Sequence, residues 1–251
     1  ASKSCEKPVT ETHLNLESEL NVLSNLLDND TYPLQKAIHQ RRSAVSMDRE
    51  TRIDRNTFFQ FLIKTSPQLN PAPFQSFPWE PQVHLGLFVH RVNDLPTGLY
   101  LLVRNENHLK EIKEKFKKEF LWRKPDFCPE ALGLFLLEEG DYVGLSKSVS
   151  CGQDIAGDGC FSLGMLSAFE KPLTQQGSWF YPRLFWECGA IGQVLYLQAE
   201  VSGIRSTGIG CFFDDPVHDI FGIKDMSYQT LYHFTVGGPV EDKRLTTLPP
   251  Y

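Results

Sequence analysis

The stretch VHLGLFVHRVNDLPTGLYLLV, residues 83–103, decides the fold class. It contains two runs rich in Val, Leu, Phe and Tyr, residues 83–89 and 98–103, which are separated by Asn93-Asp94-Leu95-Pro96. Short apolar runs bounded by turn-forming residues are typical of neighbouring strands joined by a tight connection. We therefore expect a strand–turn–strand unit here.

Helical patterns lie on both sides of this unit. Apolar residues at helical spacing predict helices over residues 32–40, 57–63, 108–120, 154–169 and 185–201. The last is the most apolar, and Gly203 is well placed to end it. Further strands are expected at residues 133–137, 142–145 and 231–236. These elements predict an α+β domain with a central, mostly antiparallel sheet flanked by helices.

The ends of the chain and a proline-rich segment set the predicted domain limits. Leucines spaced between residues 14 and 27 predict an amphipathic helix, so residues 1–32 are expected to form a helical arm or connector. Residues 33–251 are expected to form the domain. Five prolines between residues 67 and 81 predict a rigid, extended loop within it.

Composition narrows the range of partners. The 251 residues are 41% hydrophobic and 22% charged, with a net charge of −6. The densest basic run, residues 110–118, alternates in sign and reads as a solvated helix, which argues against a nucleic-acid partner. No apolar run reaches the length of a membrane span, about 18 residues. A bacterial cytoplasm is the expected compartment, and a plastid stroma is the alternative.

Six cysteines, at positions 5, 128, 151, 160, 188 and 211, show neither a CxxC pair nor clustered spacing. In a domain of this size we expect reduced, buried thiols and no metal site. Cys151 precedes a predicted helix, so a thiolate nucleophile is the alternative to a buried structural residue. The seven histidines form no metal-binding pattern, and two of them, His84 and His233, fall within predicted strands.

Two further motifs could bind an anionic, planar ligand. Arg41-Arg42-Ser43 follows a short predicted helix and offers two guanidiniums and a hydroxyl, which suit a phosphate group; the alternative is a solvated basic turn. The stretch 207–212, TGIGCF, offers glycine backbone that a ring could approach closely, whereas the alternative is a tight turn. Asp214-Asp215 is better explained as a loop or helix cap than as a metal-binding pair.

Read together, six segments resemble the nitroreductase-like superfamily, and in particular its SagB-type dehydrogenase branch. They are residues 37–43, 89–100, 150–156, 186–197, 208–215 and 232–245, in the expected order. The resemblance implies an α+β fold that dimerises through long helices and holds FMN in the interface. It also implies an FMN-dependent oxidoreductase that takes electrons from a donor such as NAD(P)H and acts on a small molecule or peptide.

The resemblance assigns a site by position. Arg41, Arg42 and Ser43 would hold the ribityl phosphate, joined by Arg244 or Lys243 from the C-terminal end. Gly208, Ile209 and Gly210 would approach the N5/O4 edge of the flavin. Cys151 and Gln153 are assigned to the same cofactor site. From the partner subunit, the ring would be contacted by Pro73, Phe74, Gln75 and Ser76. The flavin itself would supply the chemistry, so no catalytic side chain is assigned.

Three departures from the branch bear on function. The loop 73–76 lacks the Pro-Ser-Gly-Gly run common in the branch, and no adjacent Lys-Tyr pair of the azoline-oxidising members occurs. The proline-rich loop and leucine-rich N-terminus also resemble the second half of tandem nitroreductase-like proteins. The alternative function is therefore a catalytically silent, flavin-binding or scaffolding half of a pseudo-dimer.

Overall fold

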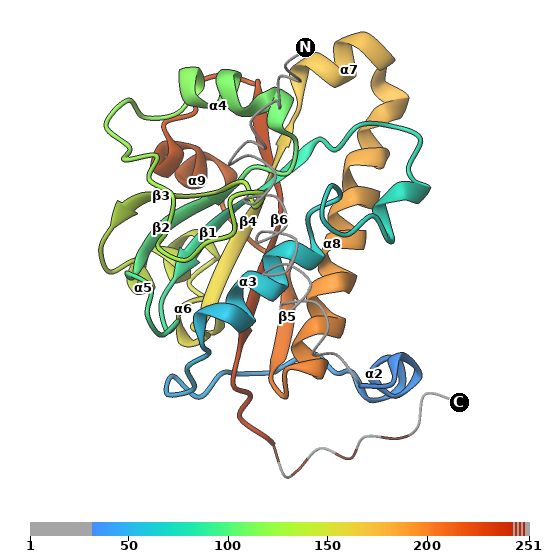
Figure 1. Cartoon of the computed structure of the whole chain (residues 1–251), viewed down its shortest axis with the longest axis vertical. Helices are drawn as coiled ribbons and strands as arrows, with labels where there is room; N and C mark the ends of the chain where they lie inside the picture. Colours follow the sequence, from blue (N-terminus) through green and yellow to red (C-terminus); the bar gives the residue numbers. More distant parts are fainter. Residues whose placement is uncertain (1–31, 243, 245, 247, 249–251) are drawn as a thin grey trace, which may run out of the picture.

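The centre of the molecule is a six-stranded sheet with the strand order β3-β2-β1-β4-β6-β5 (Figure 1). A computed structural model of the chain describes residues 32–242, 244, 246 and 248. Within it every neighbouring pair of strands is antiparallel. The predicted α+β class with an antiparallel sheet is thus confirmed. The helical arm predicted for residues 1–32 lies, apart from Tyr32, outside the described residues.

The strands are β1 Val83–Val89, β2 Gly98–Leu102, β3 Leu134–Glu139, β4 Phe161–Ala168, β5 Arg205–Ile209 and β6 Tyr228–Gly237. β1 and β2 form the predicted antiparallel pair, in which Leu87 lies opposite Tyr100. All residues of β1, β2 and β4 are buried. Such unbroken burial requires that both faces of the sheet be covered, which explains why these strands read as continuous apolar runs.

The helices are α2 Leu34–Gln40, α3 Arg55–Lys64, α4 Leu109–Lys115, α5 Val143–Val149, α6 Ile155–Asp158, α7 Glu170–Gln176, α8 Tyr181–Val201 and α9 Asp214–Phe221. Single turns of 3-10 helix occur at η1 Phe74–Ser76, η2 Glu106–His108 and η3 Ser178–Phe180. Helices α3 and α8 contribute to the apolar core on one face of the sheet. Helices α4, α5 and α9 contribute to the core on the other face.

The long helix α8 confirms the prediction made from its apolar pattern. Its buried residues include Leu184, Cys188, Ile191 and Leu195, which recur at the three- and four-residue spacing of one helix face. The helix ends at Val201, and Gly203 follows in the left-handed region at φ 70°. Because a left-handed residue stops helical propagation with little cost when it is glycine, the predicted end is also confirmed.

The helix predicted over residues 154–169 is wrong. Only α6 is helical there, and the central strand β4 follows it. Phe161, Leu163 and Met165 point to the core shared with α3 and α8. Small residues between them, Ser162 and Gly164, lie on the other face. The large apolar residues therefore repeat with a period of two. Because the residues between them are small and also buried, the segment lacks the alternation of apolar and charged residues that marks a half-exposed strand.

Two other predictions of local structure also need correction. Residues 142–145 form the start of α5 and not a strand, because the Asp141 carboxylate accepts from the Val143 amide at the beginning of a helix. The charged helix predicted to Phe120 ends at Lys115. Its solvated character is as expected, with Lys110 and Lys113 exposed and Ile112 buried.

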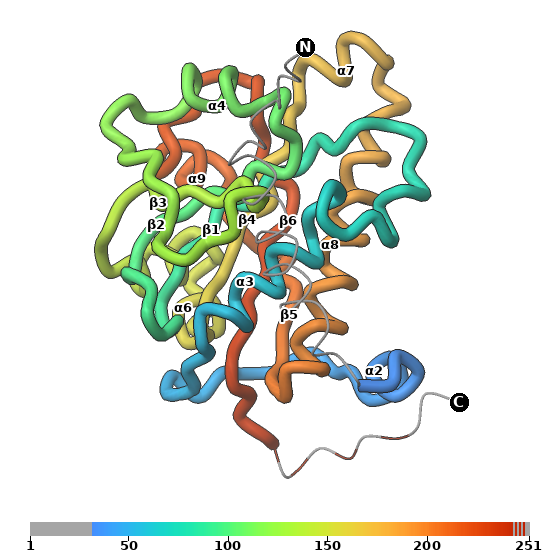
Figure 2. Tube along the Cα trace, viewed as in Figure 1, coloured from blue at the N-terminus to red at the C-terminus, as the bar shows by residue number. Residues whose placement is uncertain are grey.

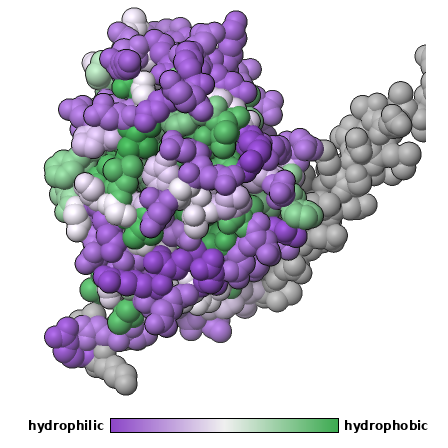
Figure 3. All heavy atoms as spheres, turned by 90° about the vertical axis from the view of Figure 1, so that its left-hand side faces the viewer, coloured by the Kyte–Doolittle hydropathy of each residue, from purple (hydrophilic) through white to green (hydrophobic). Residues whose placement is uncertain are grey.

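The side of the molecule that carries β3 and α4 is mainly polar. Hydrophilic residues cover its upper and lower parts, and an apolar band crosses its middle (Figure 3). Large apolar side chains exposed elsewhere among the described residues include Leu34 and Ile38 on α2 and Trp186 on α8. Helices α2 and α8 thus each expose large apolar side chains.

Residues 43–48 run across the ends of β5 and β6 and tie the start of the domain to its end (Figure 2). Ser43 forms a parallel bridge with Ser206 at the start of β5, and Met47 forms an antiparallel bridge with Pro239 just after β6. The Asp48 amide donates to the Gly238 carbonyl at 3.0 Å. These contacts fix where the basic segment that precedes Ser43 lies on the sheet.

A buried ion pair connects the loop after β2 to α8. The Arg104 guanidinium lies 2.5 Å from the Glu187 carboxylate, and both side chains are almost completely buried. Arg104 also donates to the carbonyls of Thr65 and Val83, while Glu187 accepts from the amides of Gln82 and Val83. Since each charge is desolvated, each depends on the other for compensation.

Removing one partner should therefore be costly. Glu187→Gln leaves the guanidinium buried without a counter-charge, and we expect it to lower the free energy of unfolding by about 3–5 kcal/mol in urea denaturation. The double variant Arg104→Met with Glu187→Leu removes both charges and should recover much of that loss. A loss below about 1 kcal/mol for Glu187→Gln would contradict this role.

Two buried histidines link the sheet to the α5–α6 region. Burial lowers the pKa of His90 and of His233 to about 4, from the usual 6.5. His90 contacts the Ser146 hydroxyl at 3.3 Å, and His233 contacts the Ser150 hydroxyl at 3.1 Å. Both imidazoles are thus held neutral in the folded chain.

Stability should consequently fall in mild acid. Because the folded-state pKa of each histidine lies below its unfolded value of 6.5, the unfolded chain binds more protons between pH 6.5 and about 4. The free energy of unfolding should decrease through this window by roughly 1.4 kcal/mol per pH unit for each histidine. Urea denaturation of His233→Gln should show a shallower pH dependence than the wild type, and His39→Gln, on α2, should not. Equal slopes for all three chains would refute the assignment.

Candidate functional site

The Tyr196 hydroxyl is the centre of the candidate site. Tyr196 lies on α8, and its hydroxyl accepts from the Gly208 amide of β5 at 2.9 Å. The same oxygen lies 2.9 Å from the Ser43 hydroxyl. One side chain therefore joins the predicted phosphate-binding segment to the predicted flavin-binding segment, which are 165 residues apart in sequence.

Backbone contacts fix the relative position of the same two segments. The Ala44 amide donates to the Ser206 carbonyl at 3.1 Å, and the Thr207 hydroxyl donates to the Ala44 carbonyl at 2.6 Å. Because Ser43 also bridges to Ser206, the segment 43–44 has a defined register against the start of β5. The predicted proximity of Ser43 to Gly208 thus follows from strand geometry.

Arg41 and Arg42 place two guanidiniums beside this junction. The Arg41 guanidinium stacks on the Tyr196 ring, 4.5 Å from its centroid. Arg42 donates to the carbonyls of His39, Arg41 and Leu248 at 3.0, 2.7 and 3.3 Å. Among the described residues neither arginine has a carboxylate within ion-pair distance. Two cations at successive positions that have no carboxylate partner within the described part of the chain favour an anionic ligand.

The glycine segment is the end of an edge strand, where a tight turn was the alternative prediction. Gly208 and Ile209 pair with Phe234 and His233 of β6, and Gly210 follows the strand. A Cβ atom at Gly208 would lie 1.9 Å from the Tyr232 hydroxyl, so packing alone explains this glycine. A Cβ at Gly210 would meet nothing within 4 Å. Gly210 is therefore the position where a ligand could approach open backbone.

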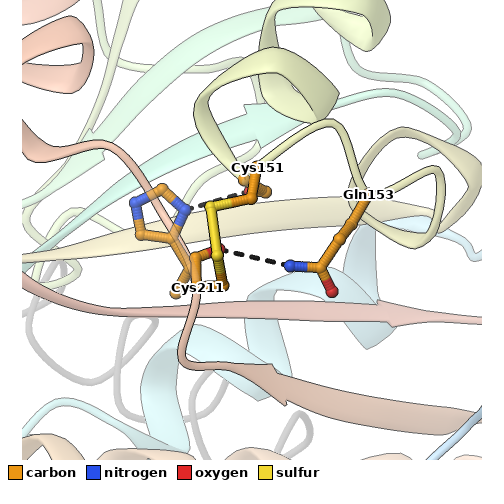
Figure 4. Close-up of a disulfide and its surroundings, with 5 residues drawn as sticks. Cys151, Gln153 and Cys211 are labelled. Carbon is orange, nitrogen blue, oxygen red and sulfur yellow. Dashed lines mark hydrogen bonds between the residues drawn. A yellow bond between two sulfur atoms is a disulfide. The ribbon is translucent and has the colours of Figure 1, made fainter.

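Cys151 and Cys211 form a disulfide, which corrects the expectation of reduced, buried thiols at these positions (Figure 4). Cys151 has φ 56° and Gly152 has φ 69°, and this left-handed turn brings Cys151 to within a Cα–Cα distance of 5.8 Å of Cys211. A pairing across 60 residues depends on the tertiary fold, so local spacing gave no sign of it. The other cysteines within the described chain, Cys128, Cys160 and Cys188, are free and buried as expected.

The buried thiols are also poorly suited to reaction. Burial raises the pKa of Cys128 to about 12 and that of Cys160 to about 11, and it raises the pKa of Cys188 further. Because the thiolate is the reactive form, these three residues have structural roles.

Gln153 lies close to the glycine segment. Its side-chain amide donates to the Cys211 carbonyl at 3.2 Å (Figure 4). Beneath Cys211, the Phe212 ring stacks on the His233 ring with centroids 4.6 Å apart. The segment 208–212 is therefore held by the strand on one side and by the α5–α6 turn on the other.

Of the remaining predicted residues, those that the structure describes are not brought into this junction. Arg244 pairs with Asp242 at 2.7 Å, its side chain is 89% exposed, and it contacts none of Arg41, Arg42 and Ser43 in the described part of the chain. Lys243 lies outside the described residues. In the predicted partner-contacting loop, Pro73, Gln75 and Ser76 are exposed, whereas Phe74 is buried against the Arg104 guanidinium.

Residues that the sequence did not single out complete the site. Tyr196, Phe212 and His233 were not assigned to it, although Tyr196 is the residue that joins its two parts. A hydroxyl-bearing residue within the most apolar helix, one residue after the buried Leu195, was the available signal. Among the described residues there is no cluster of His, Cys, Asp or Glu suited to a metal ion, and no helix with the length and apolar character that crossing a membrane needs.

An open cleft of about 1080 Å³ lies next to the glycine segment. Tyr181 and Phe185 of α8 and Gly210 and Phe212 line one part of it, and residues of α9 with the loop to β6 line the rest. Asp214, Asp215 and Asp219 of α9 face it, which gives the cleft an acidic character.

The fold and site together define an α+β domain in which two consecutive arginines, Arg41 and Arg42, precede a segment that is bonded to the glycine-containing edge strand β5. Residues 93–238 match the nitroreductase family, which is more than half of the chain. The chain belongs to the nitroreductase family. A search of curated protein sequences gave no significant match.

Solved structures share this fold at low sequence identity. A putative nitroreductase from Anabaena variabilis superposes with a TM-score of 0.63 at 22% identity, over 82% of this chain and 38% of that chain. A putative nitroreductase from Ralstonia eutropha gives 0.57 at 13%, over 84% and 85%. The Escherichia coli microcin synthetase McbBCD complex with truncated pro-MccB17 bound gives 0.54 at 14%, over 96% and 85%. The chain spans well under half the length of the Anabaena protein.

The Tyr196 junction can be tested by removing one oxygen. Tyr196→Phe keeps the ring under Arg41 but loses both hydrogen bonds, so the free energy of unfolding should fall by about 1–2 kcal/mol. Hydrogen exchange at the Gly208 amide should become faster. Tyr181→Phe, on the same helix and exposed, is the matched control. Unchanged exchange at Gly208 in Tyr196→Phe would show that the hydroxyl does not hold β5.

Proposed function

We propose that the chain is an FMN-dependent oxidoreductase and that Arg41, Arg42 and Ser43 hold the FMN phosphate. Nitroreductase family members generally bind FMN. The observation that carries the proposal is that Arg41 and Arg42, which directly precede Ser43, have no carboxylate partner among the described residues, and that the Arg41 guanidinium stacks on the Tyr196 ring whose hydroxyl contacts Ser43. Arginine suits a phosphate dianion because its planar fork of N–H donors makes charge-assisted bonds to two oxygens.

The glycine segment suits the ring of the same molecule. Gly210 offers open backbone where a side chain would otherwise stand. It lies two residues beyond Gly208, roughly 7 Å along extended backbone. Gly208 and Ser43 both contact the Tyr196 hydroxyl, so the Ser43 hydroxyl and the proposed ring site are within the length of one flavin nucleotide. Ile209 precedes Gly210, and the Gln153 side-chain amide bonds to the carbonyl of the residue after it, Cys211. Cys151 is joined to Cys211 by the disulfide. When bound, the flavin would supply two-electron hydride chemistry, while the chain binds and orients it.

A second nitroreductase-fold domain would complete the site. Leu34 on α2 is 63% exposed and Trp186 on α8 is 52% exposed. Between these helices an apolar groove of about 630 Å³ is lined by Pro73, Ala190 and Leu197. An identical or homologous copy packed on this face would bury that area. Pro73, Gln75 and Ser76 would then be available to the flavin of the other copy, whereas Phe74 is occupied in its own core.

We propose further that the chain belongs to the SagB-type branch of the nitroreductase family. This assignment is supported by the order of the six resembling segments. Lys243 and Arg244 remain candidates for further phosphate contacts. We infer a substrate that is a small molecule or peptide and a donor such as NAD(P)H.

Flavin titration tests the phosphate assignment. FMN should bind to the purified chain with quenching of flavin fluorescence, and riboflavin, which lacks the phosphate, should bind much more weakly. Arg41→Ala and Arg42→Ala should each raise the Kd for FMN by at least 10-fold, since a charge-assisted hydrogen bond contributes about 1.5–3 kcal/mol. Both variants should leave the Kd for riboflavin nearly unchanged.

Arg123→Ala, beside β3 at the edge of the sheet farthest from β5, makes the same charge change and should bind FMN as the wild type does. Equal affinity of the wild type for FMN and riboflavin would contradict the clamp. A chain that binds FMN but whose flavin is not bleached by NADH or NADPH would favour the catalytically silent half over an NAD(P)H-dependent enzyme.

A further inference from the structure

We propose that Cys151–Cys211 is a reversible dithiol–disulfide site that exchanges with neutral or cationic thiols entering through the α8–α9 cleft. The two disulfide-bonded cysteines are more exposed than the free cysteines of the described chain. Cys211 is exposed and Cys151 is half-buried, whereas Cys128, Cys160 and Cys188 are buried. Exchange requires that a thiolate reach a sulfur atom, so accessibility selects this pair.

The cleft lies next to Cys211. Gly210 and Phe212, the residues on either side of Cys211, both line it. Its volume of about 1080 Å³ is large enough for a small thiol. Cys211 is the more exposed of the two residues and the one whose neighbours line the cleft, so we expect an incoming thiolate to attack it first.

The cross-link is not the only connection between the two segments that it joins. The Phe213 amide donates to the Val149 carbonyl at 2.8 Å, and the Gln153 amide donates to the Cys211 carbonyl. Phe212 also stacks on His233, whose imidazole contacts Ser150. These contacts contain no sulfur, so they persist when the disulfide opens. The two thiols are thus kept near each other, which favours reversible closure over loss of the fold.

The exchange balances as two substitutions at sulfur. A thiolate RS⁻ attacks the Cys211 Sγ, the Sγ–Sγ bond breaks, and Cys151 leaves as a thiolate that takes a proton from water. A second RS⁻ attacks the R-bearing sulfur of the mixed disulfide between RSH and Cys211, which forms RSSR and releases the Cys211 thiolate. Two thiols are oxidised to RSSR while the protein disulfide gains two electrons, and RSSR drives the reverse reaction.

The charge of the cleft sets the preferred thiol. Asp214, Asp215 and Asp219 line it, and none of the three forms an ion pair with a described residue. Lys224 lines it as well, and Asp225 pairs with Lys115. The three carboxylates outnumber the single Lys224 ammonium, so the cleft should repel an anionic thiol and attract a cationic one, and salt should weaken both effects.

Native-state labelling tests the site without any flavin, so the outcome is independent of the proposed function. The full chain is incubated with cysteamine, alkylated and analysed by peptide mass mapping, while circular dichroism monitors the fold. Cys151 and Cys211 should be labelled together with no loss of native signal, and cystamine should restore the disulfide. Labelling that appears only as the chain unfolds, or a reduced pair that does not close again, would overturn the proposal.

The charge preference is measured with three thiols. Per thiolate and at low salt, cysteamine should reduce the disulfide several-fold faster than 2-mercaptoethanol, and mercaptoacetate should be slowest. Asp215→Asn with Asp219→Asn should bring the three rates together, whereas Asp126→Asn, outside the cleft, should not. Equal rates in the wild type would overturn the cleft as the route of entry.

The order of attack has its own test. Cys151→Ser retains the exposed sulfur and should form a mixed disulfide with cystamine rapidly. Cys211→Ser retains only the half-buried sulfur and should react more slowly. The reverse order would contradict attack at Cys211.

Discussion

The register between residues 43–44 and the start of β5 is the constraint on which the candidate site depends. Ser43 bridges to Ser206, Ala44 bonds to Ser206, and Thr207 bonds back to Ala44. These bonds hold residues 43–44 against the edge strand β5, and the Tyr196 hydroxyl of α8 then connects Ser43 with Gly208. Because the strand order places β5 at the edge next to β6, the segment has a free strand edge to occupy. The two arginines that precede Ser43 thereby lie beside the glycine strand.

The two proposals meet at a short stretch of chain. Gly210 offers the open backbone proposed for the flavin edge, and the next residue, Cys211, carries the disulfide. Gln153 contacts this stretch from the α5–α6 turn, and Phe212 is stacked on His233 beneath it. A redox-active sulfur pair next to a flavin position would place two two-electron sites on one loop. Variants can test the two sites separately, because the arginines are proposed to bind the FMN phosphate and the cleft carboxylates to select the incoming thiol.

The sequence predicted those features that depend on local pattern. The β1–β2 pair, α3 and α8 have strong apolar runs at strand or helical spacing and formed as expected. The helix predicted in place of β4 shows the limit of such patterns, since glycine and serine between the apolar residues hid a period of two. The disulfide and the Tyr196 junction were not predictable in this way. Each joins residues brought together by sheet order, and no local spacing encodes that order.

The central claim is that one ligand joins Arg41, Arg42 and Ser43 to the glycine strand. A crystal structure of the chain with FMN tests it most directly. The account predicts a phosphate within hydrogen-bond distance of Arg41, Arg42 and the Ser43 hydroxyl, and a ring edge against the backbone of Gly208–Gly210. A flavin bound elsewhere, such as in the acidic α8–α9 cleft with its phosphate away from both arginines, would contradict the account.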